Sequence, residues 1–296
     1  MNGPVAVLGP GAVGGALAVR LCLAGRHTVC VGPPETIGMI ALAGITVESR
    51  EGLLTARPEV RERLETPVSL LLVTVKAPSL DEALEHVDPE VVSGGVALPL
   101  LNGLEHMERI HEVFDGRAAA GSVSHYQAYR PGRVQIVESS PAPLVTIASD
   151  TLTASEVERV ADVLRSARIE VRVGTSEKRV LWHKAARIAP LAAATASTGK
   201  TVGVLRKDPE WRDRLQRAIR EACAVAEADG VGLNFASQWT IVEHMADETT
   251  TSAARDVASG RISELDALLG AVLRAGERLD VSTPTLRELA TSAGLP

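Results

Sequence analysis

The first half of the chain alternates short apolar runs with segments of helical periodicity. Strands are expected at residues 5–8, 27–31, 68–75, 95–101, 118–122, 133–138, 144–147 and 170–173, where these runs occur. The run at 68–75 is almost uninterrupted, which is typical of a central strand in a parallel sheet that is buried on both faces. A short hairpin is also predicted at 45–55, with its turn near Glu51 and Gly52.

Helical periodicity fills the intervals between these runs and then takes over completely. Helices are expected at 15–25, 80–86, 105–114 and 154–166, the last beginning with a capping box formed by Ser155 and Glu158. Beyond about Gly174 only helices are expected, at 176–198, 209–229, 238–245, 251–259, 263–275 (ended by Gly276) and after Pro284. The pattern therefore predicts an α/β domain at residues 1–173 and an all-α domain at residues 174–296.

A glycine motif directly follows the first predicted strand. Residues 9–14 read Gly-Pro-Gly-Ala-Val-Gly, and an Ala- and Leu-rich helix continues from them. Gly9 permits the tight turn, Gly11 lets backbone approach a pyrophosphate, and Gly14 lets the helix pack close to the strand. The phosphates would lie at the helix N-terminus, so the α/β domain is predicted to be a Rossmann-like dinucleotide-binding domain. The candidate cofactor-binding residues are Gly9, Pro10, Gly11, Ala12, Val13 and Gly14.

Polar residues follow three of the predicted strands. Lys76 comes after the central run, at the edge of a parallel sheet where ligands bind, so it is placed to meet cofactor phosphate or ribose. Asn102 comes after the next strand and can either cap the following helix or present its amide to a substrate carbonyl. Glu35, after Pro33 and Pro34, can either reach the ribose or serve as a first-turn acid of the following helix.

Composition and charge exclude several classes of protein. Aromatic residues make up 2% of the 296 residues and the net charge is −6, which argues against a nucleic-acid partner. Cys22, Cys30 and Cys223 have no metal-ligand spacing, so buried free thiols are expected and no metal site. A lone loop histidine, His125, is more often structural and is not counted in the site. No apolar run reaches membrane-spanning length, so a soluble, cytoplasmic protein without membrane contact is expected.

Taken in order, a set of short motifs resembles the ketopantoate reductase (2-dehydropantoate 2-reductase) family over nearly the whole chain. The motifs are Gly9-x-Gly11-x-x-Gly14, Lys76, Asn102-Gly103, Trp182-x-Lys184, Gly203, Thr251-Ser252-x-x-x-Asp256, Ser263-Glu264-x-Asp266, Gly270 and Pro284. Each is weak alone, but the preserved spacing of Lys184, Ser252 and Glu264 makes the set specific. The resemblance implies reduction of a branched 2-keto acid, ketopantoate to pantoate, by hydride from NADPH.

The resemblance also implies a role for each site residue. Lys184 would be the general acid, and Glu264 would orient it and touch a substrate hydroxyl. Asn102 would contact substrate and cofactor near the reacting carbon, Ser252 would bind the carboxylate side of the substrate, and Lys76 would contact the cofactor. A cation is suited to this chemistry because hydride arrival puts negative charge on the keto oxygen, and a lysine whose pKa falls on burial can also pass a proton.

This chain departs from the family's pattern at three positions. Pro34 stands where the family often has an arginine for the 2′-phosphate of NADP, so NAD is not excluded as the cofactor. Ile188 and Ala192 replace asparagines that contact substrate, which indicates a less hydroxylated substrate than ketopantoate. The alternatives are a related NAD(P)-dependent reductase acting on a less polar 2-keto or 3-hydroxy acid, and a catalytically silent NAD(P)-binding regulator. The helical domain would also supply the interface of a homodimer.

Overall fold

The computed structural model describes residues 3–124, 126–140 and 143–295 and consists of two compact units. One comprises Met1–Leu101 and His106–Val180, and the other Asn102–Glu105 and Leu181–Pro296. The units divide within a helix, a few residues after the boundary at 173/174 that the sequence indicates for the functional domains. His125 lies outside the described residues.

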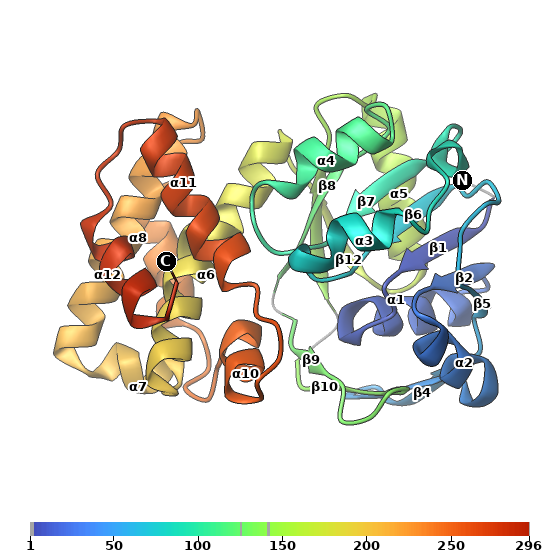
Figure 1. The fold of residues 1–296 in the computed structure, drawn as a ribbon, viewed down its shortest axis with the longest axis horizontal. Helices are drawn as coiled ribbons and strands as arrows, with labels where there is room; N and C mark the ends of the chain where they lie inside the picture. The colour runs from blue at the N-terminus through green and yellow to red at the C-terminus, as the bar shows by residue number, and fades with distance from the viewer. Residues whose placement is uncertain (1–2, 125, 141–142, 296) are drawn as a thin grey trace. The chain divides into compact units, whose positions relative to one another are not determined.

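The N-terminal unit is built on a five-stranded parallel sheet with the order β5-β2-β1-β6-β7 (Figure 1). Its strands are β1 (Val5–Leu8), β2 (Thr28–Val31), β5 (Glu59–Arg61), β6 (Leu70–Val73) and β7 (Val96–Pro99). Every residue of the four strands other than β5 is buried, which confirms the prediction from the apolar runs. The charged segment around β5 gave no such signal, because an edge strand is held by backbone pairing with β2 rather than by buried side chains.

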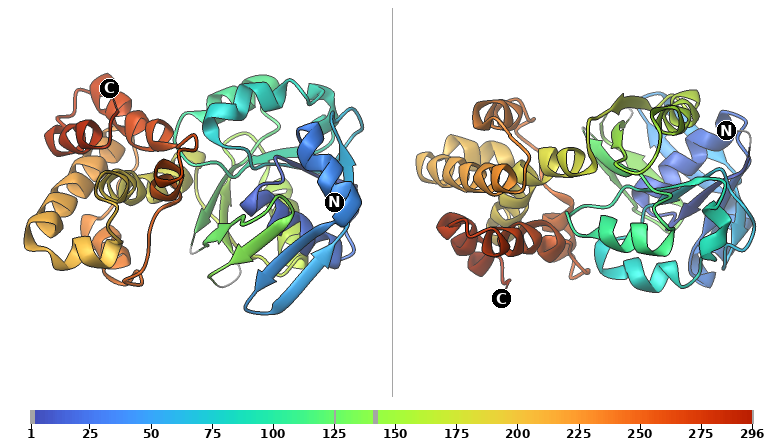
Figure 2. Two further views of the ribbon diagram at one scale, coloured as in Figure 1. Left: turned by 60° about the horizontal axis from the view of Figure 1, so that its bottom comes forward. Right: turned by 90° about the horizontal axis from the view of Figure 1, so that it is seen from above.

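Helices alternate with the strands of this unit along the chain (Figure 2). They are α1 (Ala12–Leu23), α2 (Pro34–Ala43), α3 (Leu80–Leu84), α4 (His106–Val113) and α5 (Ala154–Ser166), with 3-10 turns at Ala77–Ser79 and Pro89–Val92. Helix α1 is buried along most of its length because Gly, Ala and Leu dominate its sequence. The parallel sheet with its helices confirms the Rossmann-like fold class.

Two smaller sheets complete the N-terminal unit. One has the order β4-β3-β10-β9, with β3 (Ile45–Ser49) and β4 (Gly52–Ala56) forming the predicted hairpin beside β9 (Ala128–Tyr129) and β10 (Gln135–Glu138). The other has the order β12-β11-β8, from β8 (Ala120–Ser124), β11 (Leu144–Ala148) and β12 (Glu170–Val173). Strand β10 is tied to α1 by an ion pair of 2.8 Å between buried Arg20 and Glu138, whose other oxygen accepts from the Tyr126 hydroxyl at 2.6 Å.

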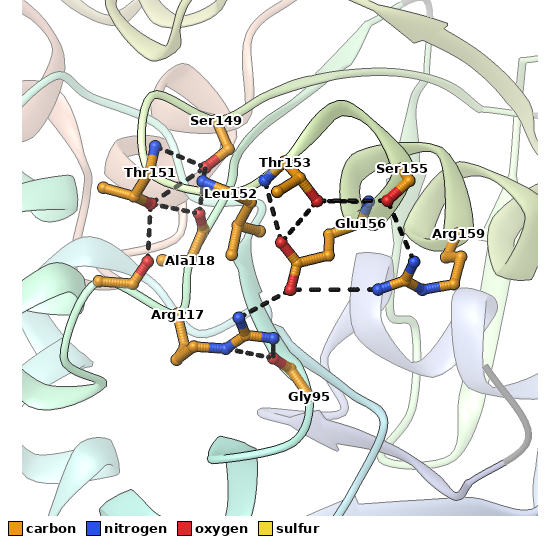
Figure 3. A network of polar contacts seen from close by, with 11 residues as sticks. Gly95, Arg117, Ala118, Ser149, Thr151, Leu152, Thr153, Ser155, Glu156 and Arg159 are labelled. Carbon is orange, nitrogen blue, oxygen red and sulfur yellow. Dashed lines mark hydrogen bonds and ion pairs between the residues drawn. The ribbon is translucent and has the colours of Figure 1, made fainter.

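Helix α5 begins with a capping box that lies two residues earlier than the sequence indicates (Figure 3). Thr153 is the N-cap, and its backbone N–H donates to Glu156 Oε2 at 2.9 Å, so the predicted box of Ser155 and Glu158 is wrong. Glu156 also accepts from Arg117 at 2.8 Å. These donors lower the pKa of Glu156 to about 2. The sequence holds two hydroxyl–glutamate pairs at box spacing, Thr153 with Glu156 and Ser155 with Glu158, and the first pair forms the cap.

The second unit is helical throughout its described part (Figure 1). Its helices are α6 (Glu177–Thr198, from Leu181 onward), α7 (Val202–Lys207), α8 (Pro209–Ala228), α9 (Phe235–Glu243), α10 (Ser252–Ala258), the π-helical turn Asp266–Gly270, α11 (Ala271–Arg278) and α12 (Pro284–Ser292). Their buried core consists of aliphatic side chains together with Trp182, Trp239 and Cys223. This confirms the prediction that an all-α part follows the α/β part of the chain.

Two glycines that look like helix breakers in the sequence lie inside helices. Gly203 belongs to α7, in an interval where no helix is expected, and a Cβ there would lie 2.5 Å from the Asp247 Cα. Gly276 lies within α11, which continues to Arg278, so the predicted end at Gly276 is wrong. A Cβ at Gly276 would lie 3.1 Å from Thr283 Cγ2. Both glycines permit close packing between segments rather than ending a helix.

Candidate active site

The glycine turn between β1 and α1 has the geometry that a dinucleotide needs. Gly9 has a φ of +83°, and a Cβ at Gly14 would lie 2.1 Å from Thr74 Oγ1. A Cβ at Gly11 would instead meet only one atom, the Gly9 carbonyl oxygen at 3.9 Å. Gly9 and Gly14 are thus required by the fold, whereas the space beside Gly11 is open. A phosphate can approach the backbone there.

The start of α1 offers hydrogen-bond donors to that space. Gly11 is the N-cap and has no side chain to satisfy the first N–H groups, which belong to Ala12, Val13 and Gly14. These groups and the positive end of the helix dipole fit the pyrophosphate of a nicotinamide dinucleotide. Thr74 fixes the turn by donating from Oγ1 to the carbonyls of Leu8 and Gly9 at 3.0 and 2.8 Å. Thr74 is not predicted from the sequence, because its only signal there is a hydroxyl at the end of an apolar strand.

Lys76 and Glu35 follow strands on either side of β1. Lys76 precedes the 3-10 turn after β6, so it lies at the same edge of the sheet as the glycine turn. Its cofactor contact stays a prediction. Glu35 lies in the first turn of α2 and accepts from Arg133 Nη1 at 2.6 Å. This position agrees with the interpretation of Glu35 as a first-turn acid of the helix. The Glu35 side chain is 76% exposed.

In the helical unit the structure brings together three of the predicted site residues. Asn102 accepts from Lys184 Nζ at 2.7 Å and donates from Nδ2 to Glu264 Oε2 at 2.9 Å. The chain from Glu264 to Lys184 therefore runs through the Asn102 amide, which supplies one acceptor and one donor. Asn102 and Lys184 are 82 residues apart in sequence. The segment Asn102–Glu105 belongs to the helical unit, as Lys184 does.

The environment of Lys184 changes its acidity. Burial lowers the pKa of Lys184 to about 8, the nearby Glu264 carboxylate opposes this, and Arg187 adds to it. Near neutral pH the ammonium therefore still carries its proton but releases it more readily than an exposed lysine does. This is the property required of a proton donor to a developing alkoxide.

Arg187 is a second buried cation on the same helix. It is 4% exposed and lies one turn beyond Lys184, where residues three apart share a face. Its Nη1 donates to Gln238 Oε1 of α9 at 3.0 Å and to the His183 carbonyl, while its Nε is buried without an acceptor in the described part of the chain. Burial lowers the pKa of Arg187 to about 10. Gln238 was not anticipated, because a glutamine on an expected helix carries no signal of burial.

Ser252 is not part of this hydrogen-bonded network. It is the exposed first residue of α10, and its side chain makes no hydrogen bond with any described residue. Its neighbour Thr251 caps α10 and shares a 2.8 Å hydrogen bond with Thr195 of α6. Ser252 is therefore attached through Thr251 to the helix that carries Lys184, and its substrate contact stays a prediction.

Comparison with known proteins decides the family. The model of the N-terminal part of ketopantoate reductase PanE/ApbA matches residues 5–147, and that of its C-terminal part matches residues 178–293. A 2-dehydropantoate 2-reductase of Caulobacter vibrioides is 30% identical over 292 residues, which cover 95% of this chain and 94% of that protein. The chain belongs to the ketopantoate reductase family. As a member of this family it is an NAD(P)-dependent oxidoreductase.

Solved structures of similar fold support the architecture. The ketopantoate reductase of Ralstonia eutropha JMP134 superimposes with a TM-score of 0.88 at 24% identity, covering 98% of this chain and 97% of that chain. A D-mandelate dehydrogenase in complex with NADH and anilino(oxo)acetate superimposes with a TM-score of 0.90 at 19% identity, with the same coverage. At such identities the likeness concerns the fold.

Two negative findings concern other classes of site. In residues 3–124, 126–140 and 143–295 no helix is long and apolar enough to cross a membrane. Nor does any cluster of histidine, cysteine or acidic side chains in those ranges have the makings of a metal site.

Proposed function

We propose that this protein reduces a branched 2-keto acid with NADPH, and that 2-dehydropantoate, giving pantoate, is the first substrate to test. The observation that carries the proposal is the series of hydrogen bonds Lys184–Asn102–Glu264, in which a partly buried lysine is held by an amide that a carboxylate holds in turn. A catalytically silent regulator has no need of a proton donor held in this way.

The reaction needs a hydride and a proton. The dinucleotide held by the glycine turn and Lys76 would supply the hydride to the keto carbon and be oxidised. Negative charge then develops on the former keto oxygen, where the Lys184 ammonium stabilises it and transfers a proton to it. The neutral amine recovers its proton from solvent. The alcohol so formed has gained two electrons and two hydrogens, one of them from Lys184.

Asn102 and Glu264 prepare Lys184 for this step. The Asn102 carbonyl oxygen directs one N–H of Lys184, and Glu264 fixes the orientation of the amide through Nδ2. The Glu264 carboxylate also favours the charged form of Lys184, so the proton is in place when the substrate binds. Ser252 would bind the carboxylate side of the substrate, and Glu264 a substrate hydroxyl where one is present.

A specific observation favours a second candidate substrate. Ile188 and Ala192, which replace the family's asparagines, are partly and fully buried on the helix that carries Lys184. A polar hydroxyl against these side chains would lose its hydrogen bonds, so a 2-keto acid without that hydroxyl would be preferred. Anilino(oxo)acetate, which is bound in the D-mandelate dehydrogenase of similar fold, is a 2-oxo carboxylate that carries no hydroxyl group.

The remaining parts of the proposal concern the biological setting. Reduction of ketopantoate would place the protein in pantothenate biosynthesis. We also propose that it acts in the cytoplasm and forms a homodimer through the helical unit. The cofactor is proposed to be NADP rather than NAD, although Pro34 stands at the position of the expected arginine.

The test follows the absorbance of the reduced nicotinamide after mixing purified protein, NADPH or NADH, and a 2-keto acid. Ketopantoate and 2-ketoisovalerate form a matched pair, because they differ by the hydroxymethyl group that Ile188 and Ala192 would face. Rapid oxidation of NADPH by either acid supports the proposal, and the faster acid identifies the substrate class. Oxidation by neither acid, with cofactor binding intact, contradicts it.

A further inference from the structure

Two arginines of one loop lie beside the glycine turn and the end of β2. Arg130 Nη1 donates to the Pro10 carbonyl at 3.3 Å, and Arg133 Nη1 donates to Glu35 Oε2 at 2.6 Å. Both arginines belong to the segment between β9 and β10. This segment is distant in sequence from both contacts, by 120 residues for Arg130 and 98 for Arg133.

The segment is anchored on the side that faces α1. The Val134 carbonyl accepts from Thr46 N of β3 at 3.0 Å, and Ile136 is 2% exposed. A Cβ at Gly15 of α1 would lie 2.6 Å from Ile136 Cδ1, so β10 packs directly on α1. The buried ion pair of Arg20 and Glu138 also joins α1 to β10. The two arginines thus lie in the loop directly before a strand that packs against α1, the helix whose N-terminus would bind the pyrophosphate.

The charges of this cluster are not balanced. Glu35 is the carboxylate paired with Arg133, whereas Arg130 has the Pro10 carbonyl as its acceptor within the described residues. Burial and the neighbouring Arg133 lower the pKa of Arg130. Two guanidinium groups and one exposed carboxylate leave an excess of positive charge beside the turn. A phosphate dianion would relieve their repulsion and accept from both arginines.

We propose that Arg133, assisted by Arg130, binds the 2′-phosphate of NADP. This inference rests on the proposed function, in which a dinucleotide occupies the glycine turn. In such folds the end of the second strand faces the adenine ribose. Glu35 occupies that place, and the Arg133 guanidinium is hydrogen-bonded to it. The arginine that Pro34 replaces in sequence is therefore supplied from the segment before β10.

Glu35 and Arg133 should act in opposite directions on cofactor choice. A carboxylate beside the ribose accepts from the two hydroxyls of NAD and repels a 2′-phosphate, whereas a guanidinium binds the phosphate. Removing Arg133 should weaken the binding of NADP and leave the Glu35 carboxylate free to accept from the ribose hydroxyls of NAD. Removing the negative charge of Glu35 should strengthen the binding of NADP. This reciprocal pattern would not follow from a merely structural surface ion pair, whose loss has little effect on binding.

The experiment measures binding without catalysis. Affinities of adenosine 2′,5′-bisphosphate and 5′-AMP are determined by calorimetry for the full chain, and those of NADPH and NADH by fluorescence. In the wild-type protein we expect tighter binding of the bisphosphate and of NADPH. R133Q should weaken both by about tenfold or more, with 5′-AMP and NADH unchanged or tighter, because a charge-assisted phosphate contact is lost. E35Q should instead strengthen the binding of the bisphosphate and of NADPH relative to 5′-AMP and NADH.

R57Q is the matched control. Arg57 is an exposed arginine of the same unit that donates to the Leu42 carbonyl at 3.2 Å, so its loss removes the same charge elsewhere. No change in preference is expected for it. Equal binding of both adenine nucleotides by the wild type, or an unchanged preference in a folded R130Q/R133Q double variant, overturns the inference and leaves keto-acid reduction with NADH intact. Binding of none of the four ligands overturns the proposed function itself.

Discussion

At the scale of single residues, the site depends on the two-sided hydrogen bonding of Asn102. An aspartate there would offer Glu264 no donor, and an alanine would leave Lys184 without its 2.7 Å acceptor. The sequence left open whether Asn102 caps a helix or contacts ligand. Its side chain in the structure is directed to Lys184 and Glu264, a pairing that no local pattern reveals, because the partners lie 82 and 162 residues away.

The acidity of Lys184 predicts a pH dependence. The ammonium is the reactive form in reduction, and its pKa of about 8 lies below the ordinary lysine value, so the proton is present below pH 8 and lost as the pH rises through it. Above that pH, kcat/KM for keto-acid reduction should fall about tenfold per pH unit. R187Q should move this descending limb to higher pH, because Arg187 lowers the pKa of Lys184. A limb that stays in place in R187Q would show that Arg187 does not act on Lys184.

The glycine turn predicts different outcomes for two similar substitutions. G11A places a methyl group in open space, so thermal unfolding should be unchanged while dinucleotide affinity falls by about tenfold or more. G14A instead places a Cβ 2.1 Å from Thr74 Oγ1 and should lower the thermal unfolding midpoint. Cofactor titration and thermal unfolding of both variants check this. Full cofactor affinity in G11A would exclude a phosphate from the space beside residue 11.

At the scale of elements, the start of α5 offers a stability test. T153A removes the N-cap and should reduce the free energy of unfolding by about 1 kcal/mol in a urea titration. S155A, at the position indicated by the sequence, should have almost no effect. The depressed pKa of Glu156 means that its contribution is present above the ordinary glutamate range and is lost as the pH falls toward 2. Equal losses in the two variants would contradict this assignment of the cap.

Elements with strong periodicity were predicted from the sequence, and those fixed by tertiary contact were not. The buried runs of β1 and β6 and the amphipathic α5 agree with their predicted positions. Strand β5 was missed because backbone pairing holds it, and α7 because Gly203 serves close packing on Asp247. A glycine in sequence does not reveal whether it ends a helix or admits a neighbouring backbone.

At the scale of the whole molecule, the chemistry is divided between two units of the chain. The glycine turn and Lys76 belong to the N-terminal unit, and Lys184, Asn102 and Glu264 to the helical unit. The sequence indicated this division, except that Asn102 leaves the strand it follows and joins the helical unit. No local hydrophobic pattern indicates this, because the side chains that Asn102 contacts lie 82 and 162 residues away in sequence.

The most direct test of the account is the turnover of K184A with the preferred 2-keto acid, measured together with its NADPH affinity. General acid catalysis is worth about a hundredfold to ten-thousandfold, so kcat should fall by that factor. NADPH binding and thermal unfolding should remain close to wild type, and K178A, an exposed lysine of the same helix, should retain full turnover. Near-wild-type turnover in K184A would contradict the assignment of Lys184 as the proton donor.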